Sequence, residues 1–225
     1  MAKRQIKSRE RIVDHGEVFT AEREVNAMLD LVKDESERID SRFLEPACGD
    51  GNFVAAILKR KLTSVARKYG KSPSDYERYS IVALTSIYGI DIMEDNIIEC
   101  RKRLYDAWNK EYDAHCGNET DDGCRNAAQY ILDRNILCGD ALTMLRSDNT
   151  PIIFSQWDLA VGNKMKRRDY RLDQLMCDDA PQMSLTYYAY RGNFEYDTMS
   201  SAWIPHPIAE YPLMDYREVQ YADQA

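Results

Sequence analysis

Several stretches of the chain repeat apolar residues at the spacing of one helical face. The first covers about residues 20–38, where apolar positions recur at i, i+3, i+4 and i+7, and Thr20 stands where an N-cap belongs. The same spacing predicts a second helix after Phe53, a third around residues 97–108 and a fourth over residues 125–132. These stretches set the helical part of the predicted fold.

Short apolar runs lie between these stretches and predict buried strands. The runs cover residues 43–44, 81–90, 135–138 and 152–161. The last run is expected to break at Ser155-Gln156. Residues 71–79 are polar and contain a proline, and residues 113–123 are polar and contain a glycine, so both are expected to be loops. Strands that alternate with helices favour an α/β fold: a doubly wound sheet with helices on both faces.

A polar residue follows each of the predicted strands. These residues are Glu45, Asp91, Asp140 and Asn163. Ligands of doubly wound sheets bind at the carboxyl ends of the strands. We therefore expect the four side chains to converge on one crevice.

Residues 164–225 have a different pattern and hold eight of the fifteen tyrosines. A short helix is predicted over residues 172–177. A hairpin is predicted between residues 185–190 and 194–197, because Arg-Gly-Asn separates them. Beyond Pro207 the chain is expected to be irregular and loosely packed.

The net charge of −8 excludes a protein that is basic over its whole surface. Two short segments are nevertheless basic, residues 1–11 and residues 164–171. A local nucleic-acid contact is therefore open, and its candidate residues are Lys164, Lys166, Arg167 and Arg168. We expect three parts: a basic arm over residues 1–11, a main domain over residues 12–163 and an extension over residues 164–225.

The six cysteines and three histidines are scattered and lack the short spacings of zinc sites. We expect reduced thiols and no metal. The chain has no apolar run of membrane-spanning length and no secretory signal near its start, so a cytoplasmic protein without a membrane anchor is expected.

Gly49 and Gly51 flank Asp50 between a predicted strand and a helix. Glycines at such a turn let the backbone approach a ligand, and the N–H groups of the following helix attract a carboxylate or a phosphate. The acidic Glu45 just before the loop disfavours a phosphate. A ligand with cationic groups and its own carboxylate fits both features, and S-adenosylmethionine (SAM) is such a ligand.

Residues 43–53 resemble the SAM-binding motif of the adenine-N6 DNA methyltransferases of restriction–modification systems. The family pattern is an acid, Pro, Ala, any residue, Gly, any residue, Gly, Asn and Phe, and it is matched from Glu45 to Phe53. The resemblance implies a Rossmann-like SAM-methyltransferase sheet over about residues 12–163. It also implies DNA as a partner, together with a specificity or restriction subunit.

The resemblance extends to three further segments, residues 16–20, 88–92 and 138–142. In the family the first lies over the methionine end of SAM. In the second an acid binds the ribose hydroxyls and the next residue packs on adenine, and in the third an aspartate meets the adenine amino group. The implied SAM contacts are Thr20, Glu45, Pro46, Ala47, Gly49, Gly51, Asp91, Ile92, Asp140 and Ala141.

The match ends at the catalytic motif. In the family an Asn or Asp is followed by two prolines and an aromatic residue, which together accept the amino protons and stack on the flipped base. Asn163 is present and is the one catalytic candidate, but Lys164, Met165 and Lys166 follow it. Restoring Pro, Pro and Tyr at these positions is expected to raise DNA methylation if the scaffold is otherwise competent.

Three functions therefore remain open. The first is an adenine-N6 DNA methyltransferase. The second is a SAM-binding relative without catalytic activity that acts as a binding or regulatory module. The third is a methyltransferase for another amine, on protein or RNA.

Overall fold

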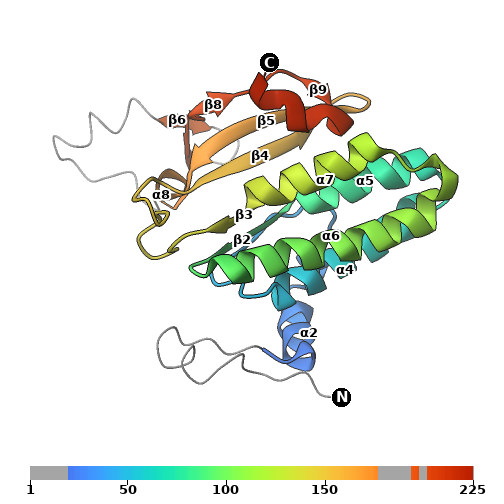
Figure 1. Ribbon diagram of the computed structural model, residues 1–225, viewed down its shortest axis with the longest axis horizontal. Helices are drawn as coiled ribbons and strands as arrows, with labels where there is room; N and C mark the ends of the chain where they lie inside the picture. The colour runs from blue at the N-terminus through green and yellow to red at the C-terminus, as the bar shows by residue number, and fades with distance from the viewer. Residues whose placement is uncertain (1–19, 177–193, 198–201, 225) are drawn as a thin grey trace.

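The computed structural model describes residues 20–176, 194–197 and 202–224 (Figure 1). Its helices are α2 (Glu22–Leu31), α3 (Lys33–Glu37), α4 (Asn52–Tyr69), α5 (Pro73–Thr85), α6 (Glu94–Cys116), α7 (Asp122–Asn135) and α8 (Leu172–Leu175), with 3-10 turns η1 (Gly117–Glu119) and η2 (Tyr216–Gln224). Its strands are β1 (Phe43–Glu45), β2 (Ile87–Asp91), β3 (Ile136–Cys138), β4 (Ile153–Leu159), β5 (Lys164–Arg171), β6 (Phe194–Asp197), β7 (Ala202–Pro205), β8 (Ala209–Glu210) and β9 (Met214–Asp215). Within these ranges, no helix combines the length and apolar character needed to cross a membrane.

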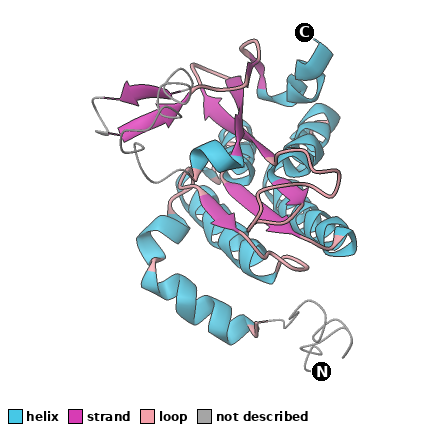
Figure 2. Ribbon diagram, turned by 90° about the vertical axis from the view of Figure 1, so that its left-hand side faces the viewer, coloured by secondary structure: helices cyan, strands magenta, loops and turns pink. Residues whose placement is uncertain are grey.

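The first three strands form a parallel sheet in the order β1-β2-β3. Each connection between them is a pair of helices that runs out and back: α4 and α5 join β1 to β2, and α6 and α7 join β2 to β3 (Figure 1). One residue, Ser86, separates α5 from β2, and α7 leads directly into β3. The helices therefore extend well past the amino ends of the strands. α2 and α3 lie outside the sheet, against α4 (Figure 2).

The two faces of the parallel sheet are covered differently. Ile87 and Ile136 point into the large core formed with the helices. Tyr88, Ile90 and Leu137 point to the other face, because neighbouring strand residues alternate sides. There they pack on side chains of β4, of α8 and of the residue before β4, namely Ile152, Phe154 and Leu172. The mixed α/β class is confirmed, but the second face is not the helical layer that a doubly wound sheet predicts.

The second sheet is built on an antiparallel hairpin of β4 and β5. β8 and β9 pair with the other edge of β5, and η2 packs along α7. The predicted break in β4 is therefore wrong, and so is the expectation of an irregular chain beyond Pro207. β6 pairs with β7. Its predicted partner, residues 185–190, lies outside the described residues.

Residues 71–79 were expected to form a loop, but most of them belong to α5. Pro73 occupies the first turn, where its missing N–H costs nothing, and the Ser72 hydroxyl caps the helix by accepting from the Asp75 N–H at 3.3 Å. The apolar run 81–90 is accordingly divided: it is helical to Thr85 and becomes a strand at Ile87. A buried helix end and a buried strand have the same apolar composition, so periodicity alone does not separate them.

Lys61 is a buried lysine of α4 that fixes the segment leading into β1. Its ammonium donates to the carbonyl oxygens of Arg38 at 3.0 Å and Ile39 at 3.2 Å, and to the Ser86 hydroxyl at 2.8 Å. Burial lowers the pKa of Lys61 from 10.5 to about 7, against the attraction of Asp40.

This lowered pKa predicts a pH-dependent stability. Between pH 7 and 10.5 the unfolded chain binds the Lys61 proton and the folded chain does not, so the Lys61 contribution to the free energy of unfolding rises with pH. We expect the difference between wild type and Lys61→Met, measured by urea unfolding from pH 7 to pH 8.5, to change by up to about 1.4 kcal/mol per pH unit. Lys59→Met, an exposed change on the same helix, should show no such slope. Parallel curves for wild type and Lys61→Met would contradict the prediction.

Candidate functional site

The carboxyl ends of β1, β2 and β3 bring three of the predicted site residues to one edge of the parallel sheet. They are Glu45, Asp91 and Asp140. Asp91 joins the neighbouring loops directly. Its Oδ2 accepts from the Gly49 N–H at 2.9 Å, and its backbone carbonyl accepts from the Gly139 N–H at 3.0 Å. The glycine loop, the end of β2 and the end of β3 are therefore held together by one residue.

The Asp91 carboxylate retains acceptor capacity. Oδ1 accepts from the Met93 N–H at 2.9 Å and from the Asn96 amide at 3.1 Å, while Gly49 is the protein donor to Oδ2. A carboxylate offers about four acceptor positions. Oδ2 can therefore accept one further donor, such as a hydroxyl group of a ligand.

The glycine loop is shaped by two residues with positive φ, Gly49 at 54° and Gly51 at 91°. A Cβ at Gly51 would lie 2.8 Å from the Cys100 sulfur, so the loop also requires glycine for space. Asp50 turns away to Arg103, whose guanidinium lies 2.6 Å from its Oδ2. Asp50 therefore has a structural role at this edge.

The amino end of α4 gives the same edge a region suited to an anion. The helix starts at Asn52, and its first turn contains no acidic side chain. The first N–H groups of a helix have no acceptor within the helix, and together with the helix dipole they favour a carboxylate there. Glu45 lies half-buried nearby in sequence, at the end of β1. Burial raises the pKa of the Glu45 carboxyl, and the Ala47 N–H, which donates to it at 3.4 Å, opposes this.

Asp140 sits in a turn just after β3. Its carboxylate accepts from the Leu142 N–H at 2.9 Å and from the Thr143 hydroxyl at 3.1 Å, and these bonds lower its pKa. Two large apolar side chains are exposed beside the acids: Ile92 is 59% exposed and Leu142 is 92% exposed. The edge thus combines acceptors, an anion-binding helix end and apolar surface.

Asn163 is not at this edge, which corrects the expectation of four converging residues. β4 runs opposite to β1, β2 and β3. Its Trp157 donates to Asn135, and its Asp158 lies 3.3 Å from Arg42; these two partners directly precede β3 and β1. The turn that follows therefore lies beyond the amino ends of the parallel strands, where the Asn163 carbonyl accepts from the Tyr216 N–H at 2.9 Å.

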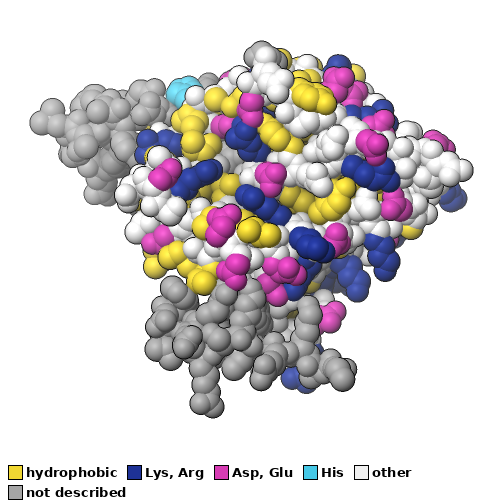
Figure 3. Space-filling model, viewed as in Figure 1, with side chains coloured by type: hydrophobic (Ala, Val, Ile, Leu, Met, Phe, Trp, Pro, Cys, Tyr) yellow, Lys and Arg dark blue, Asp and Glu magenta, His cyan; other side chains and the backbone are white. Residues whose placement is uncertain are grey.

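Three of the four basic residues expected to contact nucleic acid form ion pairs with acidic side chains of the protein. The prediction is wrong for Arg167, which is 2% exposed and lies 2.6 Å from Asp169 and 2.8 Å from Asp223. Strand pairing places it on the inner face of β5. The ion pairs of the other two are Lys166 with Glu210 at 3.1 Å and Arg168 with Asp158 at 2.8 Å. Lys164 is exposed and forms no ion pair within the described ranges. On the face drawn in Figure 3, acidic and basic side chains are intermixed.

The remaining predicted SAM contacts differ in their location and in their exposure. Pro46 and Ala47 are exposed on the glycine loop, and Ala141 is half-buried after Asp140. Thr20 is exposed at the start of the described chain, and Ala21, one residue later, holds the N-cap position of α2. Residues 16–19 lie outside the described residues. Within the described part, no group of three or more His, Cys, Asp or Glu side chains is arranged for a metal ion.

Asn96 and Arg103 hydrogen-bond to acids of this region, and the sequence did not predict either contact. Both lie on α6 and reach back to the acids of the two preceding loops. Comparison with protein-family models, with curated proteins and with solved structures finds no match to this chain.

Proposed function

We propose that this chain binds SAM at the carboxyl edge of β1, β2 and β3, in a Rossmann-like domain of the methyltransferase type. The observation that carries the proposal is the tie between Gly49 and Asp91, which joins the glycine loop to the acid after β2 at 2.9 Å. A ligand that spans both loops meets a prearranged surface there.

Each part of SAM has a matching group at this edge. The ammonium and sulfonium suit the acidic Glu45, and the carboxylate suits the amino end of α4. A ribose hydroxyl can donate to the remaining acceptor position of Asp91. The exposed Ile92 offers an apolar surface for adenine, and Asp140 an acceptor for its amino group.

We further propose that the protein is a binding or regulatory module, and that Asn163 does not methylate adenine at this edge. The turn that carries Asn163 lies past the amino ends of the parallel strands. The Asn163 carbonyl accepts a hydrogen bond from the Tyr216 N–H. Adenine-N6 methylation stays a second candidate because residues 45–53 match the family pattern. It would require an acceptor for the amino protons other than Asn163.

A matched pair of substitutions tests SAM binding. Asp140 and Asp148 are exposed or half-exposed acids in similar turns, and Asp148 accepts from the Thr150 N–H at 2.9 Å as Asp140 does from Leu142. Asp140→Asn is expected to weaken SAM binding about tenfold in calorimetry, the size of one charged hydrogen bond. Asp148→Asn should change it less than about twofold. Equal losses of SAM affinity in the two variants, or no SAM binding by wild type, would contradict the proposal.

Transfer of labelled methyl from SAM to unmethylated DNA separates the two candidate functions. We expect SAM to bind and no label to appear on adenine or cytosine. Label on adenine N6 that survives Asn163→Ala would show an active methyltransferase with a different acceptor. Label that is lost in Asn163→Ala would overturn the assignment of Asn163 to a non-catalytic position.

A further inference from the structure

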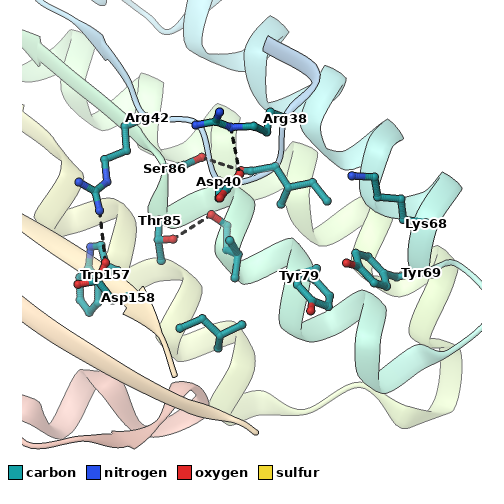
Figure 4. Close-up of a pocket in the computed structure, with 13 residues that line it drawn as sticks. Arg38, Asp40, Arg42, Lys68, Tyr69, Tyr79, Thr85, Ser86, Trp157 and Asp158 are labelled. Atoms are coloured by element: carbon teal, nitrogen blue, oxygen red, sulfur yellow. Dashed lines mark hydrogen bonds and ion pairs between the residues drawn. The ribbon is translucent and has the colours of Figure 1, made fainter. Parts of the chain in front are cut away.

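A hollow of about 440 Å³ lies at the amino end of the parallel sheet, opposite the edge described above (Figure 4). Four elements form its wall: the segment before β1, the last turn of α4, the face of α5 and the end of β4. Arg42 directly precedes β1, and Ser86 directly precedes β2, which fixes the location. The volume is that of a small-molecule site.

The charges of this wall are mostly paired and leave one lysine for an anion. Its cations are Arg38, Arg42 and Lys68, and its acids are Asp40 and Asp158. Arg38 is paired with Asp40 at 3.3 Å and with Glu35 at 3.6 Å. Arg42 is paired with Asp158 at 3.3 Å, and Asp158 is also bound by a cation from β5. Lys68 forms no ion pair with a described residue, and Figure 4 shows its side chain directed toward the hollow.

The rest of the wall is aromatic and apolar, with polar groups at the edge of the sheet. Tyr69 and Tyr79 stack with ring centroids 3.8 Å apart, and Trp157 closes the opposite side (Figure 4). Thr85 and Ser86 lie between them, but their buried hydroxyls already donate to the carbonyl oxygens of Val82 and Ile39, at 2.9 Å and 3.1 Å. Flat rings suit an aromatic base, and the carboxylates of Asp40 and Asp158 can accept from the hydroxyl groups of a sugar.

The wall is also held rigid before any ligand arrives. The buried Lys61 donates to three carbonyls of the segment before β1 and to Ser86, so the backbone that carries Arg38 and Asp40 is fixed. A site built in advance loses less free energy on binding than one that must first be ordered.

We propose that this hollow binds a nucleoside monophosphate, with the phosphate at Lys68 and the base against the aromatic side chains. The phosphate matches the unpaired lysine, the sugar hydroxyls match the two carboxylates, and the base matches the rings. The proposal is independent of SAM binding. The hollow lies at the amino ends of β1 and β2, the proposed SAM site lies at their carboxyl ends, and the two share no residue.

Calorimetry with adenosine 5′-monophosphate as the probe tests the site on the full chain. We expect binding by wild type, at least about tenfold weaker binding of adenosine, and about fivefold weaker binding of the monophosphate by Lys68→Ala. Lys59→Ala is the matched control, because it removes an exposed lysine from the same helix outside the hollow. It should leave the affinity within about twofold.

Three results would overturn the proposal. They are no binding of the monophosphate at millimolar concentration, equal binding of adenosine, and equal affinities of Lys68→Ala and Lys59→Ala. The last result would place the probe elsewhere on the molecule. Both lysines are exposed, so thermal unfolding of the two variants should match wild type and the comparison does not depend on altered folding.

Discussion

Replacing Glu77 by leucine is expected to lower the free energy of unfolding by about 3–5 kcal/mol. Glu77 is an acid of α5 that is only 2% exposed. It accepts from the Tyr112 hydroxyl, from the Tyr216 hydroxyl at 2.6 Å and from the Arg217 guanidinium at 2.6 Å. Leucine would leave one cation and two buried hydroxyls without their acceptor, and such groups are costly in a low-dielectric interior.

Urea unfolding of Glu77→Leu, Arg217→Leu and the double variant measures this network. Because the two side chains are in direct contact, the double variant should lose clearly less than the sum of the single losses. Glu99→Leu, an exposed change on α6, should stay within about 0.5 kcal/mol of wild type. A loss below about 1 kcal/mol in Glu77→Leu would show that the network contributes little to stability.

The same network determines how η2 is attached. Tyr216 and Arg217 begin η2, and both contact Glu77 across about 140 positions of sequence. Hydrogen exchange of the amides in residues 216–224 should therefore be faster in Glu77→Leu even under conditions where α4 remains protected. Equal exchange rates in the variant and wild type would contradict this attachment.

Local signals in the sequence were sufficient to predict that Glu45, Asp91 and Asp140 lie at one edge of the parallel sheet. The acid, the paired glycines and the helix start at Asn52 lie within eight residues, and the strand-end aspartates Asp91 and Asp140 follow apolar runs. The structure brings these residues together because parallel strands of similar length end at one edge. Here local pattern and global fold give the same answer.

The incorrect predictions concern features that depend on contacts between residues far apart in the sequence. The direction of β4 depends on its pairing with β5 and on contacts to residues before β1 and β3, none of which leaves a pattern within β4 itself. The basic run after Asn163 alternates sides in a strand, so Arg167 is buried while Lys164 is exposed. A count of charges cannot distinguish these two positions.

The triple substitution Lys164→Pro/Met165→Pro/Lys166→Tyr restores the sequence of the family's catalytic motif, but the structure reverses the expected result. These positions begin β5. The Lys164 N–H donates to the Val161 carbonyl at 3.4 Å, and Met165 pairs with Leu159 of β4 on one side and Met214 of β9 on the other. Proline removes N–H donors and is not tolerated inside a sheet.

We therefore expect the triple variant to lose at least about 3 kcal/mol of stability in urea unfolding and to gain no adenine methylation. Met165 is 1% exposed, so its replacement also removes packing from the core. Lys164→Ala/Met165→Leu/Lys166→Ala keeps every backbone N–H and should lose less than about 1.5 kcal/mol. A Pro-Pro-Tyr variant that is as stable as this control and methylates adenine would mean that the turn at Asn163 reaches the carboxyl edge of β1, β2 and β3, and that β4 runs in the other direction.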